Sequence, residues 1–149
     1  MKFKLPLISA MLAIASLAAC GGSGSDSGSS APAVSVPATL TYTDTAVGTG
    51  ATAVAGKTVK VHYTGYLYST GVASFKGTQI DSSAGLAPYQ FVLGSNAVIA
   101  GFDIGVTGMK VGGKRTVMFP ASQGYGAAGN SKVPPNTGLV FDLELVEVL

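Results

Sequence analysis

Residues 139–148, LVFDLELVEV, alternate between apolar and acidic side chains. Successive side chains of an extended segment point to opposite faces, so Phe141, Leu143 and Leu145 share one face and the acidic residues share the other. This period of two predicts a β-strand with one face against a core and the other in water. Half-covered strands of this kind are typical of antiparallel sheets.

Four other segments of the chain also have the pattern of β-strands, and one segment has the pattern of a helix. Residues 98–109 (VIAGFDIGVTGM) are the only stretch suited to a helix, and three glycines limit that helix to a short one near 101–107. One short helix against antiparallel strands predicts an α+β domain. The further expected strands are 58–64, 89–93, 114–119 and, more weakly, 40–43.

The N-terminus has the pattern of a targeting segment. Lys2 and Lys4 precede a mostly apolar stretch, residues 5–19, which ends in small residues. The order basic, apolar and small is that of a secretory signal peptide, so residues 1–19 are excluded from the fold.

The end of this segment, Leu-Ala-Ala-Cys at 17–20, resembles the lipobox of bacterial lipoproteins. The resemblance implies cleavage before Cys20 and acylation of that residue, and several acyl chains give stable membrane anchoring. Cys20 is the only cysteine, so no intramolecular disulfide is expected. Gly21 after it implies an outer-membrane protein facing the periplasm. The alternatives are an ordinary cleaved signal with a chance cysteine, or an uncleaved anchor.

A tether follows the signal segment. Residues 20–37 contain the run GGSGSDSGSS, which has no large side chain to bury. A Gly/Ser-rich tether of about 17 residues has a root-mean-square reach of roughly 20 to 25 Å. Residues 38–149 then form one domain.

Charge excludes some classes of partner. Charged residues make up 11% of the chain, against roughly 25% in an average soluble protein. Without Lys2 and Lys4, the nine basic residues become seven and equal the seven acidic ones. A near-neutral mature chain argues against nucleic acid and other phosphate-rich partners.

The usual catalytic groups are nearly absent from the domain. The domain contains one histidine, His62, and no cysteine. This composition excludes a Cys-His pair and a His-rich metal site. His62 lies in mid-strand and no Gly-x-Ser-x-Gly elbow is present, so we interpret His62 as structural. An enzyme built from these residues would act without a metal or cofactor, through shape, desolvation and hydrogen bonds.

Several aromatic and aliphatic residues could form either a packed core or a ligand cup, and the sequence leaves both open. They are Tyr63, Phe91, Val98, Ile99, Phe102, Tyr125 and Phe141.

Eight motifs taken together resemble the FKBP-type peptidyl-prolyl cis-trans isomerases. They occur in the family's order and cover about 57–149 continuously. The motifs are VHYTG at 61–65, Asp81-Ser82-Ser83, FVLG at 91–94, Val98-Ile99 with Gly101-Phe102, GMKVGGKR at 108–115, Gly124-Tyr125-Gly126, Val133-Pro134-Pro135-Asn136 and LVFDLELVEV at 139–148.

The resemblance implies a sheet of five or six antiparallel strands curled around the short helix, with a shallow apolar pocket between them. It implies that Phe102 forms the floor, that Asp81 is the one pocket carboxylate, and that the Ile99 N–H and Tyr125 hydroxyl bind carbonyl oxygens of a peptide. Tyr63, Asp81, Ile99 and Tyr125 are the expected catalytic residues. The expected pocket residues are Tyr63, Ile80, Asp81, Phe91, Val98, Ile99, Phe102, Tyr125, Val133 and Phe141.

The resemblance also implies a function. The expected partners are proline-containing, unfolded or partly folded exported proteins, with macrolide inhibitors as further ligands, and the expected state is a monomer. The chain departs from the family in Ile80, which stands where an aromatic residue is common, and in about four extra residues between Gly65 and Asp81. The extra residues predict a longer hairpin or a bulge at the pocket edge. The alternatives are a non-catalytic peptide-binding or chaperone module and a purely structural lipoprotein.

Overall fold

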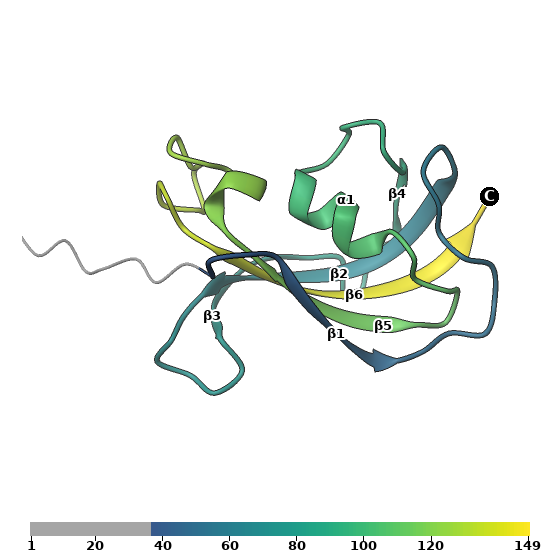
Figure 1. The fold of residues 1–149 in the computed structure, drawn as a ribbon, viewed down its shortest axis with the longest axis horizontal. Coiled ribbons are helices and arrows are strands. Elements are labelled where there is room, and N and C mark those ends of the chain that lie inside the picture. Colours follow the sequence, from purple (N-terminus) through teal and green to yellow (C-terminus); the bar gives the residue numbers. More distant parts are fainter. Residues whose placement is uncertain (1–36) are drawn as a thin grey trace, which may run out of the picture. The chain divides into compact units, whose positions relative to one another are not determined.

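The structure, a computed structural model, describes residues 37–149 (Figure 1). The predicted signal peptide, the acylated Cys20 and the tether as far as residue 36 lie outside the described residues. The elements in chain order are β1 (Thr41–Ala46), β2 (Thr58–Tyr68), β3 (Lys76–Ser82), β4 (Tyr89–Val92), α1 (Ala100–Val106), β5 (Lys114–Phe119), a 3-10 turn (Ala121–Gln123) and β6 (Leu139–Val148).

The strands form one antiparallel sheet in the order β1-β5-β6-β2-β3, and β4 also pairs with β2. The six strands and the short helix α1 confirm the predicted α+β class. The helix lies on one side of the sheet (Figure 1). On β6, Phe141, Leu143 and Leu145 are buried and the acidic residues between them are partly exposed, as their alternation predicts.

Two strands differ from the expectation. The strand β3, Lys76–Ser82, was not expected, because its sequence KGTQIDS is polar and carries little β-propensity. It forms because β2 continues to Tyr68 and offers it a partner. The register between β2 and β3 shifts on both sides of Tyr66, so the extra residues produce both a longer hairpin and bulges.

Two glycines bring α1 close to the sheet. A Cβ atom on Gly105 would lie 2.9 Å from Val117 Cγ1, and one on Gly101 would overlap the ring of Phe119. The absence of both side chains lets the helix backbone rest directly on β5 and β6. Phe102, between the two glycines, is consequently buried in the core with 4% exposure.

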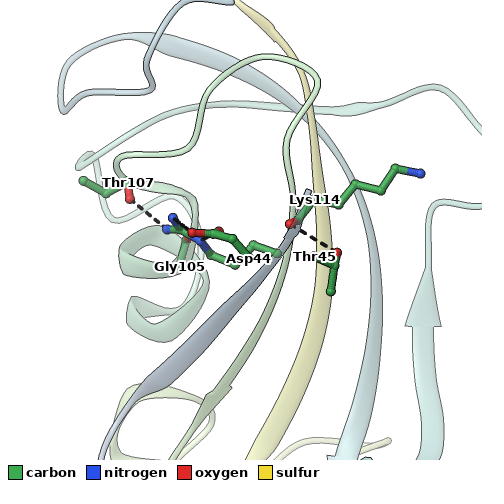
Figure 2. A network of polar contacts seen from close by, with 6 residues as sticks. Asp44, Thr45, Gly105, Thr107 and Lys114 are labelled. Carbon is green, nitrogen blue, oxygen red and sulfur yellow. Dashed lines mark hydrogen bonds and ion pairs between the residues drawn. The ribbon is translucent and has the colours of Figure 1, made fainter. Parts of the chain in front are cut away.

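A buried arginine fastens the far end of the helix. Arg115 on β5 is 7% exposed, and its Nη1 donates to the carbonyl oxygens of Gly105 at 3.0 Å and Thr107 at 3.2 Å. Its Nε and Nη2 donate to both carboxylate oxygens of Asp44 on β1, at 2.6 and 3.2 Å. Arg115 thus joins β1, β5 and the end of α1. Figure 2 shows its partners Asp44, Gly105 and Thr107 close together. Charge-assisted bidentate pairs of this kind are strong and directional.

The close helix approach predicts the effect of adding one methyl group. We expect Gly101→Ala to lower the free energy of unfolding by about 1 to 3 kcal/mol, because the helix must move off Phe119 to accommodate it. The control is Gly71→Ala in the β2–β3 loop, where the added Cβ would meet only Ser69 Oγ at 3.6 Å. Urea unfolding measures both variants, and equal stability of the two would contradict this account of the packing.

Candidate active site

A cavity of about 520 Å³ opens between the start of α1 and the strands. Its side chains come from β2, β3, β4, β6, α1 and two loops, so the whole fold is needed to build it. The lining residues are Tyr63, Ile80, Asp81, Tyr89, Asn96, Ala97, Val98, Ile99, Phe102, Tyr125 and Phe141.

The floor of the cavity is a cluster of aromatic rings. Phe102 packs edge-to-face against Phe141, with ring centroids 5.4 Å apart, and against Tyr63 at 5.5 Å. Phe102 and Phe141 are each 4% exposed. Edge-to-face pairs fix the relative orientation of the rings, so the floor is apolar and rigid.

One polar pair interrupts this apolar lining. The Tyr63 hydroxyl donates to Asp81 Oδ2 at 2.9 Å, and the Ser82 N–H donates to Oδ1 at 2.9 Å. Burial, followed by the hydrogen bond to Asp81, raises the pKa of Tyr63 to about 12. The hydroxyl therefore remains a donor at any physiological pH and holds the carboxylate in place.

Two further hydrogen-bonding groups lie on the cavity wall. Ile99 immediately precedes α1, and its N–H has no hydrogen-bond acceptor among residues 37–149. Tyr125 is 37% exposed, in a loop held by hydrogen bonds from Gly129 N–H to its carbonyl and from Asn136 N–H to Gly126. The cavity thus offers a backbone donor and a phenol hydroxyl to a bound molecule.

Most of the expected pocket residues do meet at this cavity. Phe91 and Val133, which were also expected, are not part of this lining. Phe91 is 5% exposed and packs behind Phe102 at 5.7 Å, and Val133 is 1% exposed within the core. The expected residues that line the cavity are Tyr63, Ile80, Asp81, Val98, Ile99, Phe102, Tyr125 and Phe141.

Sequence reasoning missed Tyr89, Asn96 and Ala97. Tyr89 shares a face of β4 with Phe91 but lies one step nearer the opening, where it is 41% exposed and 6.2 Å from the Tyr63 ring. The two-residue period of β4 was the signal that could have found it. Asn96 adopts a positive φ of 59°, which asparagine tolerates better than most residues.

A second hollow, of about 550 Å³, lies against the polar face of the sheet. Its charged side chains form ion pairs: Lys76 pairs with Asp142 at 2.7 Å, Lys114 with Glu144 at 3.5 Å, and Arg115 with Asp44, which lies outside the lining, at 2.6 Å. His62 lines this hollow and not the aromatic cavity. The aromatic cavity is therefore the candidate active site.

Residues 37–149 hold neither a metal site nor a membrane-spanning helix. That part of the chain contains no group of three His, Cys, Asp or Glu side chains arranged to hold a metal ion. It also contains no helix long and apolar enough to span a membrane.

Known proteins with similar sequences were found. The family model of the FKBP-type peptidyl-prolyl cis-trans isomerase matches residues 49–146. The peptidyl-prolyl cis-trans isomerase FKBP15-3 of Arabidopsis thaliana is 46% identical over 99 residues, which are 66% of this chain and 65% of that protein. An FK506-binding protein of Neisseria meningitidis is 44% identical over 101 residues, which are 66% of this chain and 86% of that protein.

A solved structure shares the fold. The crystal structure of AtFKBP13 superposes with a TM-score of 0.65 and 33% identity, and covers 78% of this chain and 98% of the matched chain. Its likeness extends over the same sheet and helix that enclose the cavity. Since the family model matches most of the described domain, the chain belongs to the FKBP-type peptidyl-prolyl cis-trans isomerase family.

Proposed function

We propose that the protein accelerates cis–trans isomerisation of Xaa-Pro bonds in exported proteins. One observation carries the proposal: a rigid aromatic floor stands beside one fixed carboxylate and two available hydrogen-bonding groups. The family supplies the reaction class, and the cavity is suited to it.

The reaction needs a change of environment rather than a proton transfer. An Xaa-Pro bond interconverts over a barrier of about 18 to 20 kcal/mol, which arises from amide resonance. Resonance separates charge, so an apolar cavity weakens the planar form relative to the twisted form. A cavity shaped for the twisted amide then binds the transition state more tightly than the substrate. A thousandfold acceleration needs only about 4 kcal/mol of such differential binding.

Each polar group has a separate role in this proposal. The Ile99 N–H and the Tyr125 hydroxyl bind carbonyl oxygens of the peptide and hold the chain across the Phe102 floor. The Asp81 carboxylate, oriented by Tyr63, lies beside the prolyl amide. Twisting the amide localises the lone pair on nitrogen and leaves the carbonyl carbon more electron-poor, so a fixed negative charge that faces this carbon favours the twisted state.

The named residues predict the behaviour of variants. We expect Asp81→Ala and Tyr125→Phe each to lower kcat/KM on an Xaa-Pro peptide by about tenfold or more. Asp81→Ala removes the charge that favours the twisted amide, and Tyr125→Phe removes a hydroxyl that holds the peptide across the floor. The assay is cis-to-trans relaxation of the peptide, with circular dichroism to show that the fold is retained.

Tyr42→Phe is the matched control for Tyr125→Phe, since it removes a phenol hydroxyl from β1, outside the cavity lining. Unchanged kcat/KM in both Asp81→Ala and Tyr125→Phe would refute the assigned roles.

A second candidate function is a non-catalytic peptide-binding or chaperone module. Exposed apolar side chains favour it, namely Leu86 at 68% and Tyr89 at 41% exposure, in and beside the loop between β3 and β4. Ile80 in place of an aromatic side chain favours it as well. Slow turnover by the unmodified protein, together with peptide binding, would support this alternative.

The same cavity is proposed to bind macrolides. The relatives named FK506-binding proteins support this, because the aromatic floor and rim of the cavity provide a large apolar contact surface. The ligand would compete with peptide for the Phe102 floor.

The proposed location is a bacterial outer membrane, on the periplasmic side, where the protein is held as a monomer by acylated Cys20. The support is the Leu-Ala-Ala-Cys sequence at 17–20 and the Gly/Ser-rich segment that follows it. A tether of this composition would keep the domain mobile near exported clients.

Lipidation has a direct test. We expect the full chain, expressed in a Gram-negative host, to incorporate radiolabelled palmitate and to sediment with membranes, and we expect Cys20→Ala to do neither. Ser23→Ala serves as the matched control because it alters a nearby tether residue and leaves the lipobox intact. Palmitate incorporation in Cys20→Ala, or none in the unmodified chain, would show that the proposal is wrong.

A further inference from the structure

The hydroxyl of Ser83 lies at the centre of a hydrogen-bond cluster behind the cavity. Ser83 is 5% exposed, and its Oγ accepts the backbone N–H of Tyr63 at 2.9 Å. The Ser83 N–H in turn donates to the Tyr63 carbonyl at 2.9 Å. Ser83 therefore forms hydrogen bonds with both the N–H and the carbonyl of Tyr63.

This cluster lies next to the Tyr63–Asp81 pair of the cavity and connects the same two chain segments. Ser83 comes two residues after Asp81, and the Tyr63 hydroxyl bonds to Asp81 Oδ2 on the other side. The regular pairing of β2 with β3 ends here, since Thr64 pairs with Ser82, Gly65 pairs with Asp81, and the register then shifts. The Ser83 contacts extend this short ladder and, together with the hydrogen bond from Ser82 Oγ to the Tyr63 carbonyl at 3.3 Å, join the Tyr63 backbone to the segment that carries Asp81.

His62 completes the cluster from the opposite face of the sheet. Its Nδ1 lies 3.1 Å from Ser83 Oγ, whereas the Tyr63 carbonyl, the other acceptor for the serine proton, is 3.4 Å away. When Nδ1 is unprotonated, it accepts a hydrogen bond from the Ser83 hydroxyl, and a lone pair of Ser83 Oγ accepts the Tyr63 N–H. With Nδ1 protonated, it donates to the same oxygen. Either tautomer fixes the rotation of the hydroxyl.

We propose that His62 is a positioning residue for isomerisation, which acts through Ser83 to hold Tyr63 and Asp81 at their working separation. This inference rests on the proposed function of the Tyr63–Asp81 pair. His62 does not touch the cavity, so it has no part in peptide binding.

A double-mutant cycle tests the inference on the full chain. We expect His62→Phe to lower kcat about three- to fivefold with KM unchanged, the effect of one lost hydrogen bond. In a Tyr63→Phe background, which already lacks the positioned hydroxyl, adding His62→Phe should change kcat by less than about 1.5-fold, because coupled residues are not additive. His62→Asn, whose amide takes the place of Nδ1, should restore kcat to within about twofold of the unmodified protein.

Lys60→Met is the matched control. Lys60 also points to the polar face of β2, where it pairs with Glu147 at 2.6 Å, so its loss removes an outer-face contact without reaching Ser83. Its kcat should be unchanged. Urea unfolding of every variant separates lost stability from lost positioning.

Ser83→Ala breaks the same link without added bulk and keeps the test valid if His62→Phe fails to fold. It should lower kcat at least as much as His62→Phe, because it also removes the acceptor of the Tyr63 N–H. An unchanged kcat in Ser83→Ala, or equal effects of His62→Phe in the two backgrounds, overturns the inference while Tyr63→Phe still slows the reaction. If Tyr63→Phe itself leaves kcat unchanged, the proposed role of Tyr63 fails and the inference is refuted with it.

Discussion

The contact of α1 with the sheet through Gly101 and Gly105 is the constraint on which the site depends. A side chain at either position would push the helix away from Phe119 or Val117. The close contact places Phe102 against Phe141 at the cavity floor and Ile99 on the cavity wall. The cavity floor has a fixed shape, because Phe102 and Phe141 belong to the packed core.

Arg115 and the Tyr63–Asp81 pair show two uses of charge in this small domain. Arg115 is buried and donates to Asp44 at the surface and to two helix carbonyls, so its charge serves the fold. Within residues 37–149, the Asp81 side chain accepts hydrogen bonds only from the Tyr63 hydroxyl and the Ser82 N–H, and it lines an open cavity. Such an anion is held in position and remains available to a substrate.

The polar side of the sheet has a different character from the cavity side. Its charged residues satisfy one another, as in the pairing of Lys76 with Asp142. His62 differs from them because its ring contacts Ser83, which binds the N–H and the carbonyl of Tyr63, the neighbour of His62 on β2. Events at the polar face therefore have a physical route to the cavity, one residue long.

Much of the fold could be predicted from local patterns. The alternation in residues 139–148 reflects the burial of one face of a strand, and the three glycines in 98–109 limit the length of the helix. Strand β3 could not be predicted in this way, since its polar sequence is extended only through pairing with β2.

The site was predictable where a motif fixes a residue's place, as for Asp81 and Tyr125. The depth of a side chain relative to the cavity was not predictable. Phe91 and Tyr89 share a face of β4, and only packing decides that Phe91 lies behind the floor while Tyr89 lines the opening. The contact of Arg115 with Asp44 joins residues 71 apart and leaves no local signal.

The most direct test of the account is the rate of cis-to-trans relaxation of a short Xaa-Pro peptide, measured with the purified protein in the presence and absence of a macrolide of the FK506 type. We expect the protein to accelerate relaxation and the macrolide to abolish the acceleration, because both ligands need the same aromatic floor. A folded protein that binds the macrolide and leaves the relaxation rate unchanged would contradict catalysis and favour the binding module. Acceleration that persists with macrolide bound would place the chemistry outside the cavity.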